Sequence, residues 1–252
     1  PSGLIAWWSG DGHADDYIGG NPGQLVGGAS FAEGMVGEAF SIDGWGSRVR
    51  VPSSDALNPK GGFSIECWFQ SAGDGSANII GKWNMDTGDF SYILQDNGWE
   101  HPPSHYFMFG LTERSRMNTR FDLANLHGRR PMVRQEWMHV AATFDGSAAR
   151  LYVNGSLDGT WAPATGRIHS GTADILIGPM LSNVKGKETY RRIIDELCLY
   201  DRALTPDEIE AIYRAGAAGK SSGPRPKAPP RLWPDRRRTT PGDRGGPTRT
   251  PR

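Results

Sequence analysis

The side chains best suited to chemistry are oxygen donors at two places in the chain. Asp15, Asp16 and Asn21 lie among glycines in an early loop, and Asp195 precedes Glu196 in a late strand. Calcium takes about six to eight oxygen ligands, typically carboxylates, Asn side chains and loop carbonyls. These residues are therefore candidate calcium ligands. The alternative is that the early residues only form turns and that Asp195 faces solvent, since the spacing is not that of an EF-hand.

Tryptophans outside the predicted strands suggest a second chemistry. The sequence contains nine Trp, of which Trp45, Trp83, Trp99 and Trp161 lie in turn-rich segments. Carbohydrate sites use exposed aromatic rings, which stack on sugar faces beside polar groups that fix the orientation. We expect Trp45, Trp83 and Trp99 to bind ligand. The alternative for each is a core residue or a loop plug.

Arginines gather in a long middle loop, at Arg114, Arg116, Arg120, Arg129, Arg130 and Arg134. Such a group suits a sulfated glycan or an acidic protein, and we count Arg114 and Arg116 as candidate ligand-binding residues. The alternative is a solvated loop, because acidic residues alternate with the arginines.

Sequence signatures of catalysis are missing. The chain has no His-Glu-x-x-His, phosphate-loop or dinucleotide-binding pattern, and its six His lack metal-ligand spacing. Asp195 and Glu196 are adjacent, so a regular strand would point them to opposite faces and they would not form a catalytic pair. We predict that the protein is not an enzyme.

The formal charge of zero hides an asymmetry. Residues 220–252 hold ten of the 28 basic and two of the 28 acidic residues, which leaves 18 basic and 26 acidic residues in 1–219. Nucleic-acid binding needs a basic face, so the acidic body argues against such a partner. The basic segment has no hydrophobic periodicity, and we expect a disordered Pro/Arg-rich tail over 219–252 after one domain over 1–218. The alternative for this tail is a polybasic tether for acidic polymers.

The elements that must position these residues are short strands. Period-two alternation over 63–70 is typical of a half-buried strand. Asp145-Gly146 and Asn154-Gly155 are turn sequences that favour positive φ at both residues, so the strands on either side of each turn should form successive hairpins from residue 139 onward. The stretch from Ser9 to Gly28 has loop composition. Further strands are expected at 4–8, 39–42, 48–51, 79–80, 91–94, 106–109, 174–178 and 193–200.

One helix should come after the last strand. Thr205 can cap it, with Pro206 at the first helical position and Glu208 completing a capping box. Ile209, Ile212 and Tyr213 share one face, and Gly216 ends the helix. Cys67 and Cys198 should point to different faces, so we expect two free thiols, with a disulfide as the alternative. No stretch approaches about 18 consecutive apolar residues, which excludes a membrane span. The pattern predicts an all-β fold, a two-sheet antiparallel β-sandwich with one short C-terminal helix.

Six motifs in order resemble the laminin-G-like (concanavalin A-like) jelly-roll domains, relatives of pentraxins. They run from about residue 4 to 216: 7–8 (WW), 37–44 (GEAFSIDG), 63–68 (FSIECW), 137–146 (WMHVAATFDG), 151–155 (LYVNG) and 194–204 (IDELCLYDRAL).

The resemblance implies extracellular or cell-surface use and, in many members, a calcium ion. In the family, the residues matching Asp16 and Asp195 approach each other at the sandwich edge, which makes Asp16, Asn21 and Asp195 the predicted calcium ligands. The glucanases with this sandwich carry Glu-x-Asp-x-x-Glu on one strand, and that motif is absent here.

We therefore expect a non-catalytic recognition or adhesion module that binds a glycan or an extracellular protein, stabilised by calcium. The chain starts at Pro1 without an initiator Met or a leader, so we expect it to be part of a larger multidomain protein. The alternatives are a carbohydrate-binding accessory domain of a glycoside hydrolase and a structural spacer.

Overall fold

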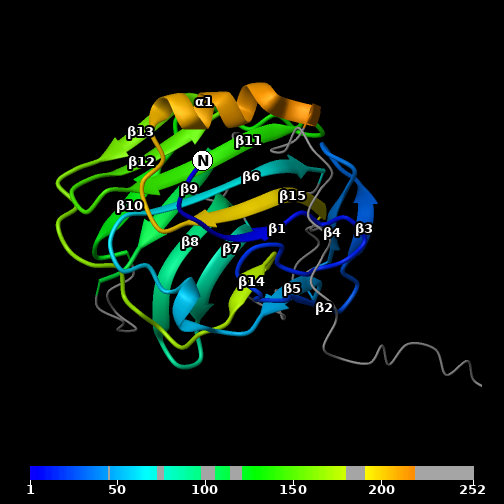
Figure 1. The fold of residues 1–252 in the computed structure, drawn as a ribbon, viewed down its shortest axis with the longest axis horizontal. Coiled ribbons are helices and arrows are strands. Elements are labelled where there is room, and N and C mark those ends of the chain that lie inside the picture. Colours follow the sequence, from blue (N-terminus) through cyan, green and yellow to red (C-terminus); the bar gives the residue numbers. More distant parts are fainter. Residues whose placement is uncertain (45, 73–76, 98–105, 114–120, 180–190, 219–252) are drawn as a thin grey trace, which may run out of the picture.

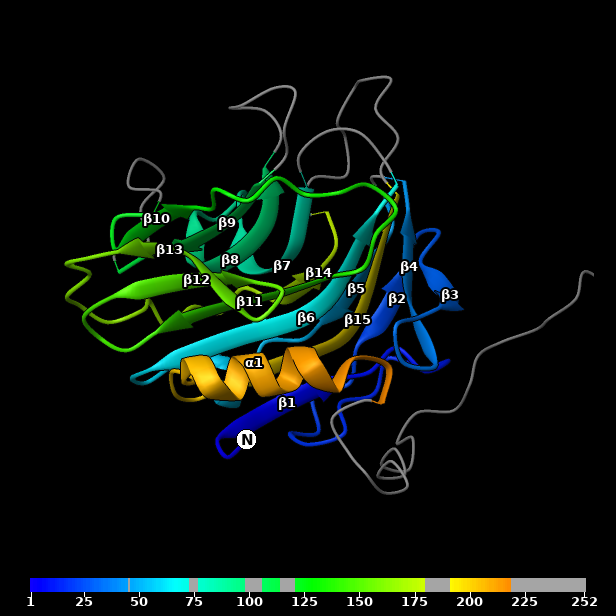
Figure 2. The same ribbon diagram turned by 90° about the horizontal axis from the view of Figure 1, so that it is seen from above.

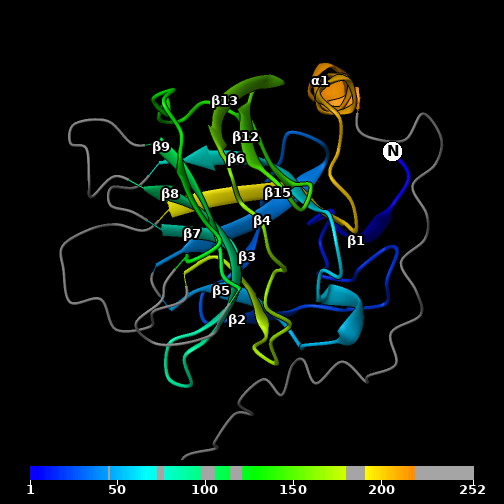
Figure 3. The ribbon, with the colours of Figure 1, turned by 90° about the vertical axis from the view of Figure 1, so that its left-hand side faces the viewer.

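A computed structural model describes residues 1–44, 46–72, 77–97, 106–113, 121–179 and 191–218. These residues form two antiparallel sheets that stack as a sandwich, with one helix outside them (Figures 1 and 3). The predicted fold class is confirmed. The predicted tail, 219–252, lies outside the described residues.

The first sheet, sheet A, is built around a long central strand, β6. Its order is β13 (Ser156–Trp161), β12 (Ala149–Val153), β11 (Met138–Phe144), β6 (Phe63–Ser71), β15 (Arg191–Tyr200), β4 (Glu38–Asp43) and β3 (Ser30–Glu33). In addition, β1 (Leu4–Trp8) pairs with the second half of β15.

The second sheet, sheet B, has the order β10 (Ala124–His127), β9 (Tyr106–Leu111), β8 (Asp89–Asn97), β7 (Ala77–Asn84), β14 (Ile175–Ile177), β5 (Arg48–Val51) and β2 (Gln24–Val26). The space between the sheets is filled by alternate residues of both, such as Phe63, Ile65 and Phe69 from β6 and Tyr92 and Leu94 from β8. This packing is the period-two pattern of the sequence.

Helix α1 (Pro206–Ala215) lies on the outer face of sheet A (Figure 2). The capping box of Thr205 and Glu208 forms as predicted, and Gly216 is the C-cap. Ile209 and Ile212 pack against a second apolar cluster on that face, which includes Trp7, Tyr152, Cys198 and Tyr200. Among the described residues, no helix is long and apolar enough to cross a membrane.

The helix changes the expected burial of β6. Its polar-side residues Ser64, Glu66 and Trp68 are as buried as its core-side residues, because α1 and neighbouring side chains cover them. The half-buried prediction was therefore wrong. Cys67 and Cys198 form no disulfide and point to different faces, as predicted: Cys67 lies between the sheets and Cys198 lies under the helix.

Two local predictions fail for identifiable reasons. The stretch read as a loop from Ser9 to Gly28 ends in the short edge strand β2, which pairs with β5 and has no buried residue to mark it. The predicted successive hairpins form from β11, β12 and β13, and Asn154 and Gly155 both have positive φ, as a two-residue turn requires, but Asp145 does not. Its carboxylate instead accepts the N–H groups of Ser147 and Ala148 and closes a longer loop.

A β-bulge breaks the alternation of β15. Asp195 pairs with Trp68 and Cys198 with Glu66, so two residues of β15 face one residue of β6. Glu196 adopts φ 54°, and both Ile194 and Leu197 point into the core. The regular alternation expected at Asp195 and Glu196 is therefore wrong, and both side chains are buried.

Candidate functional site: an aromatic pocket beneath the C-terminal helix

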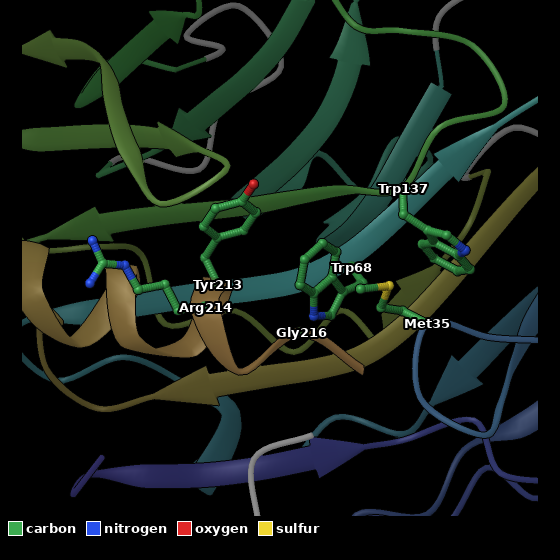
Figure 4. A pocket seen from close by; sticks show the side chains of 6 residues that line it. All are labelled: Met35, Trp68, Trp137, Tyr213, Arg214 and Gly216. Carbon is green, nitrogen blue, oxygen red and sulfur yellow. The ribbon is translucent and has the colours of Figure 1, made fainter. Parts of the chain in front are cut away.

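A pocket of about 360 Å³ opens where the end of α1 meets the outer face of sheet A. We call it the aromatic pocket. Figure 4 shows its lining, with Trp68, Trp137 and Met35 on one side and α1 on the other. The lining residues are Met35, Trp68, Trp137, Tyr213, Arg214 and Gly216.

The sandwich supplies a fixed wall. Trp68 is on the central strand β6 and is only 4% exposed, while Trp137, just before β11, is half-buried. Met35 lies in the turn between β3 and β4. That turn is held by a hydrogen bond from the Gly34 N–H to the Gly37 carbonyl (2.9 Å) and by one from the Val36 N–H to the Asp195 carboxylate (2.8 Å).

Helix α1 supplies the other wall. The Tyr213 ring lies 5.8 Å from the Trp68 ring at an angle of 34°, so the two rings pack against each other in the wall of the pocket. Tyr213 also fits against Gly155, where an added Cβ would lie 2.9 Å from the ring. The left-handed φ of Gly155, 77°, and this close approach both favour glycine there.

A buried cluster of polar side chains contacts these rings on the side of the sheet. His139 Nε2 lies 3.2 Å from Glu66 Oε2, and the Tyr200 hydroxyl donates to Glu66 Oε1 at 3.2 Å. The His139 ring contacts both Trp68 (5.3 Å) and Tyr213 (6.3 Å). Burial, followed by the neighbouring Glu66 carboxylate, raises the pKa of Tyr200 far above its ordinary value. This hydroxyl therefore stays protonated and keeps donating.

The polar groups at the pocket mouth suit a ligand with hydroxyl groups. Arg214 is 75% exposed and pairs with Glu210 at 2.5 Å. The pocket also adjoins the C-terminal end of α1, where the Gly216 N–H donates to the Tyr213 carbonyl. Aromatic faces beside both donors and acceptors can bind an apolar ring face and its polar rim. Among the described residues that line the pocket there is no carboxylate.

Of the predicted calcium ligands, the structure joins Asp16 and Asn21. The Asp16 carboxylate accepts hydrogen bonds from the N–H groups of Trp7, Ile18, Gly19 and Asn21, at 2.9 to 3.1 Å, and from the Asn21 side-chain amide at 2.9 Å. In this arrangement both oxygens of Asp16 organise the loop.

Asp195 has a different partner, since it accepts the Val36 N–H. Within the described ranges no group of three or more His, Cys, Asp or Glu side chains has the geometry of a metal site. The Asp16 side chain thus fits a loop-organising role better than a calcium cradle. Calcium binding stays a prediction.

Of the five predicted ligand-binding residues, only Trp83 is described. It is 5% exposed, stacks on Phe90 with ring centroids 4.0 Å apart, and belongs to a small apolar cluster with Ile93 and Met108. Trp45, Trp99, Arg114 and Arg116 lie outside the described residues. Trp161, on edge strand β13, is 42% exposed.

The pocket residues were not predicted from the sequence. The pattern did place Trp68 on the polar side of β6 and Tyr213 on the apolar side of the helix. Together these two placements indicate a helix that lies over an aromatic face of a strand. This is the sequence signal from which the pocket could have been predicted. Met35 carried none, because a tertiary contact brings its turn to the pocket.

Comparisons with known proteins agree with the fold. The laminin-G family model described as "Concanavalin A-like lectin/glucanases superfamily" matches residues 43–210. Human pappalysin-1 is 27% identical over 183 residues, which is 68% of this chain and 11% of the human protein. The mouse protein is 28% identical over the same length. The chain thus spans about a tenth of the length of these relatives.

Several solved structures share the architecture. The binding domain of Paraclostridial Mosquitocidal Protein 1 has a TM-score of 0.67 at 12% identity, covering 84% of this chain and 52% of that one. Domain 4 of the extracellular arabinanase AbnA of Geobacillus stearothermophilus, solved with arabinotriose, has a TM-score of 0.58 at 19% identity, covering 82% and 97%. At these identities the likeness shows the fold.

Proposed function

This chain belongs to the concanavalin A-like lectin/glucanase superfamily, and from that premise we propose that it is a non-catalytic recognition module that binds a glycan in the aromatic pocket. The observation that carries the proposal is a pocket lined by three aromatic side chains, Trp68, Tyr213 and Trp137, with Arg214 at its margin. Sugars expose C–H faces that stack on such rings, and their hydroxyls hydrogen-bond at the rim.

The comparisons support this choice of ligand class. The arabinanase domain, whose length this chain covers almost completely, was solved with arabinotriose. The other structure quoted above is the binding domain of a mosquitocidal protein. A fold serves many functions, so this support is by analogy, and the pocket carries the argument.

A binding role also agrees with the placement of the acids. Glycoside hydrolysis needs two carboxyl groups that flank the scissile bond. Glu66, Asp195 and Glu196 are each at most 1% exposed, and none of them lines the pocket. We further propose an extracellular setting as part of a larger protein, because pappalysin-1 is much longer than its match to this chain. Calcium would act as a stabiliser of the fold.

The proposal is tested by an oligosaccharide screen that includes arabinotriose, followed by titration of the full chain. Trp137→Ala removes a half-buried ring that packs in no core cluster, and it should weaken binding about tenfold or more, since one stacking aromatic is worth about 1.5 kcal/mol. Trp161→Ala is the matched control, because it removes an exposed Trp at the end of β13 that pairs with Ala149, away from the Gly155 end that contacts Tyr213. Equal affinity of both variants and the unmodified chain would exclude the pocket, and binding of an extracellular protein instead would support the alternative ligand class.

A further inference from the structure

We propose that docking of α1 onto sheet A is linked to occupancy of the aromatic pocket, so that a ligand in the pocket holds the helix in place. The inference rests on the proposed function, because it concerns the same pocket. It adds that α1 is a closing wall and that the site is complete only when the helix is docked.

The lining of the pocket is divided between two bodies. Met35, Trp68 and Trp137 come from the sandwich, whereas Tyr213, Arg214 and Gly216 come from α1 and its C-cap. Figure 4 shows Trp68, Trp137 and Met35 beside the last turn of α1, which carries Tyr213 and Arg214. Moving the helix away would remove one wall completely and leave the Trp68 ring without its Tyr213 neighbour.

The buried contact between α1 and the sandwich is small. Within the helix only Ile209 and Ile212 are buried. Each central strand of sheet A instead has most of its side chains buried, as in β6 and β11. Elements with few buried apolar contacts open locally at a lower free energy than the core, so α1 is the element of this face best able to undock.

The polar anchors of α1 lie at the end away from the pocket. Thr205 and Glu208 form the capping box, and Arg202 donates to both Glu208 oxygens at 2.8 and 2.6 Å. At the pocket end, Tyr213 packs on Trp68 and Gly155. The anchored first turn can therefore act as the hinge while the last turn moves.

Ligand binding and helix docking are linked because the two walls of the pocket come from separate elements. A ligand that contacts both walls binds the docked state more tightly than the undocked state, and it must then stabilise docking by the same free energy. Undocking of the helix must in turn weaken binding in proportion to the fraction of molecules that remain docked.

The test uses the full chain and two aspartate substitutions on opposite faces of α1. Ile209→Asp places a charge in the buried interface, and Ala211→Asp places the same charge on the exposed face. Ile212→Ala is a milder interface variant, in case the first one unfolds the protein. Arabinotriose binding and amide hydrogen exchange are measured on each variant.

We expect Ile209→Asp to raise the arabinotriose Kd by about tenfold or more, because fewer than about one molecule in ten then stays docked. Ala211→Asp should change it less than about twofold. In the unmodified chain, amides of 210–215 should exchange faster than those of β6, and saturating arabinotriose should slow the helix amides selectively. Unchanged affinity of both interface variants, or exchange of α1 only through global unfolding, would overturn the inference.

Failure of the proposed function looks different. If the unmodified chain binds neither arabinotriose nor any other sugar in the screen, the pocket is not a glycan site. The exchange of α1 relative to β6 and the quenching of Trp fluorescence by acrylamide in Ile209→Asp then decide the inference. An undocked helix exposes Trp68 and increases the quenching, and unchanged quenching contradicts a closing wall.

Discussion

Asp16 shows how one residue can shape a loop that has little apolar content. Its carboxylate accepts five hydrogen bonds, four of them from backbone N–H groups. Backbone donors that are buried must be paired, so a single acidic side chain replaces the strand partner that this segment lacks. The arrangement also fixes Asn21, whose side-chain oxygen accepts the Ser54 hydroxyl at 2.7 Å.

Replacing Asp16 should therefore destabilise the fold without any metal. We expect Asp16→Ala to lower the free energy of unfolding by about 3 kcal/mol, because several buried donors lose a charged acceptor. Urea unfolding in the presence of a chelator measures the effect. The neighbouring Asp15→Ala, which disrupts only the contact with His13, is the control and should cost less than about 1 kcal/mol. Equal losses in the two variants would contradict the loop-organising role.

Calcium is tested on the same residues by thermal unfolding with excess calcium and with chelator. A ligand that binds only the folded state raises the midpoint, and a gain of several degrees that either Asp16→Ala or Asp195→Ala abolishes would establish the predicted ion. A midpoint indifferent to calcium would mean that these carboxylates act through the hydrogen bonds described above alone.

At the scale of elements, α1 is fixed by its first turn. The Arg202 guanidinium, through its hydrogen bonds, holds the pKa of Glu208 at about 2, below the ordinary 4.5. A carboxylate with a depressed folded-state pKa contributes stability above its unfolded pKa and loses it as the pH falls toward the folded value. The clamp is therefore complete at neutral pH and weakens between about pH 4.5 and pH 2.

Glu208→Gln should reduce this pH dependence. We expect the unmodified chain to lose more thermal stability than the variant between pH 6 and about pH 3, because only the unmodified chain carries the depressed carboxylate. Glu210→Gln is the comparison, since Glu210 lies on the same helix and its pair with Arg214 is solvent-exposed. Parallel pH profiles for the unmodified chain and Glu208→Gln would rule out the clamp.

At the scale of the whole molecule, a buried ion pair joins the two sheets. Arg192 on β15 donates from Nε to Asp96 on β8 at 2.7 Å, and both side chains are fully buried. Removing one member leaves a buried charge, whereas removing both does not. We expect Arg192→Leu to cost about 3 to 5 kcal/mol and Arg192→Leu with Asp96→Leu to recover much of it.

Chemical denaturation of these variants checks the prediction. Arg50→Ala breaks the solvent-exposed pair with Asp174 on the surface of sheet B and should cost less than about 1 kcal/mol. If the double variant is no more stable than Arg192→Leu, the ion pair itself stabilises the fold. The loss in Arg192→Leu then does not come from the unpaired buried charge of Asp96.

Local pattern was enough to predict the sandwich. The alternation in β6, the turn at Asn154-Gly155 and the capping box at Thr205 depend on neighbouring residues, so the sequence displays them directly. The predictions that failed concern features that depend on residues distant in the sequence. The bulge at Asp195 arises where β15 exchanges β4 for β1 as its partner, and the burial of Glu66 requires a helix that begins about 140 residues later.

The aromatic pocket also depends on residues that are distant in the sequence. Its walls come from β6, the turn before β4, the residue before β11 and α1, four segments that only the tertiary fold brings together. Trp83, by contrast, was expected at the surface because its segment is rich in turn residues. It is covered by Phe90 and Phe121.

A ligand site beneath α1 is tested most directly by the indole N–H resonances of the Trp side chains, followed by NMR as arabinotriose, or the best sugar from the screen, is added to the full chain. We predict that the Trp137 and Trp68 signals, assigned by Trp→Phe substitution, shift with one saturable profile while that of Trp161 stays in place. Saturable shifts at Trp161 or Trp83, with Trp137 unmoved, would contradict the proposed site.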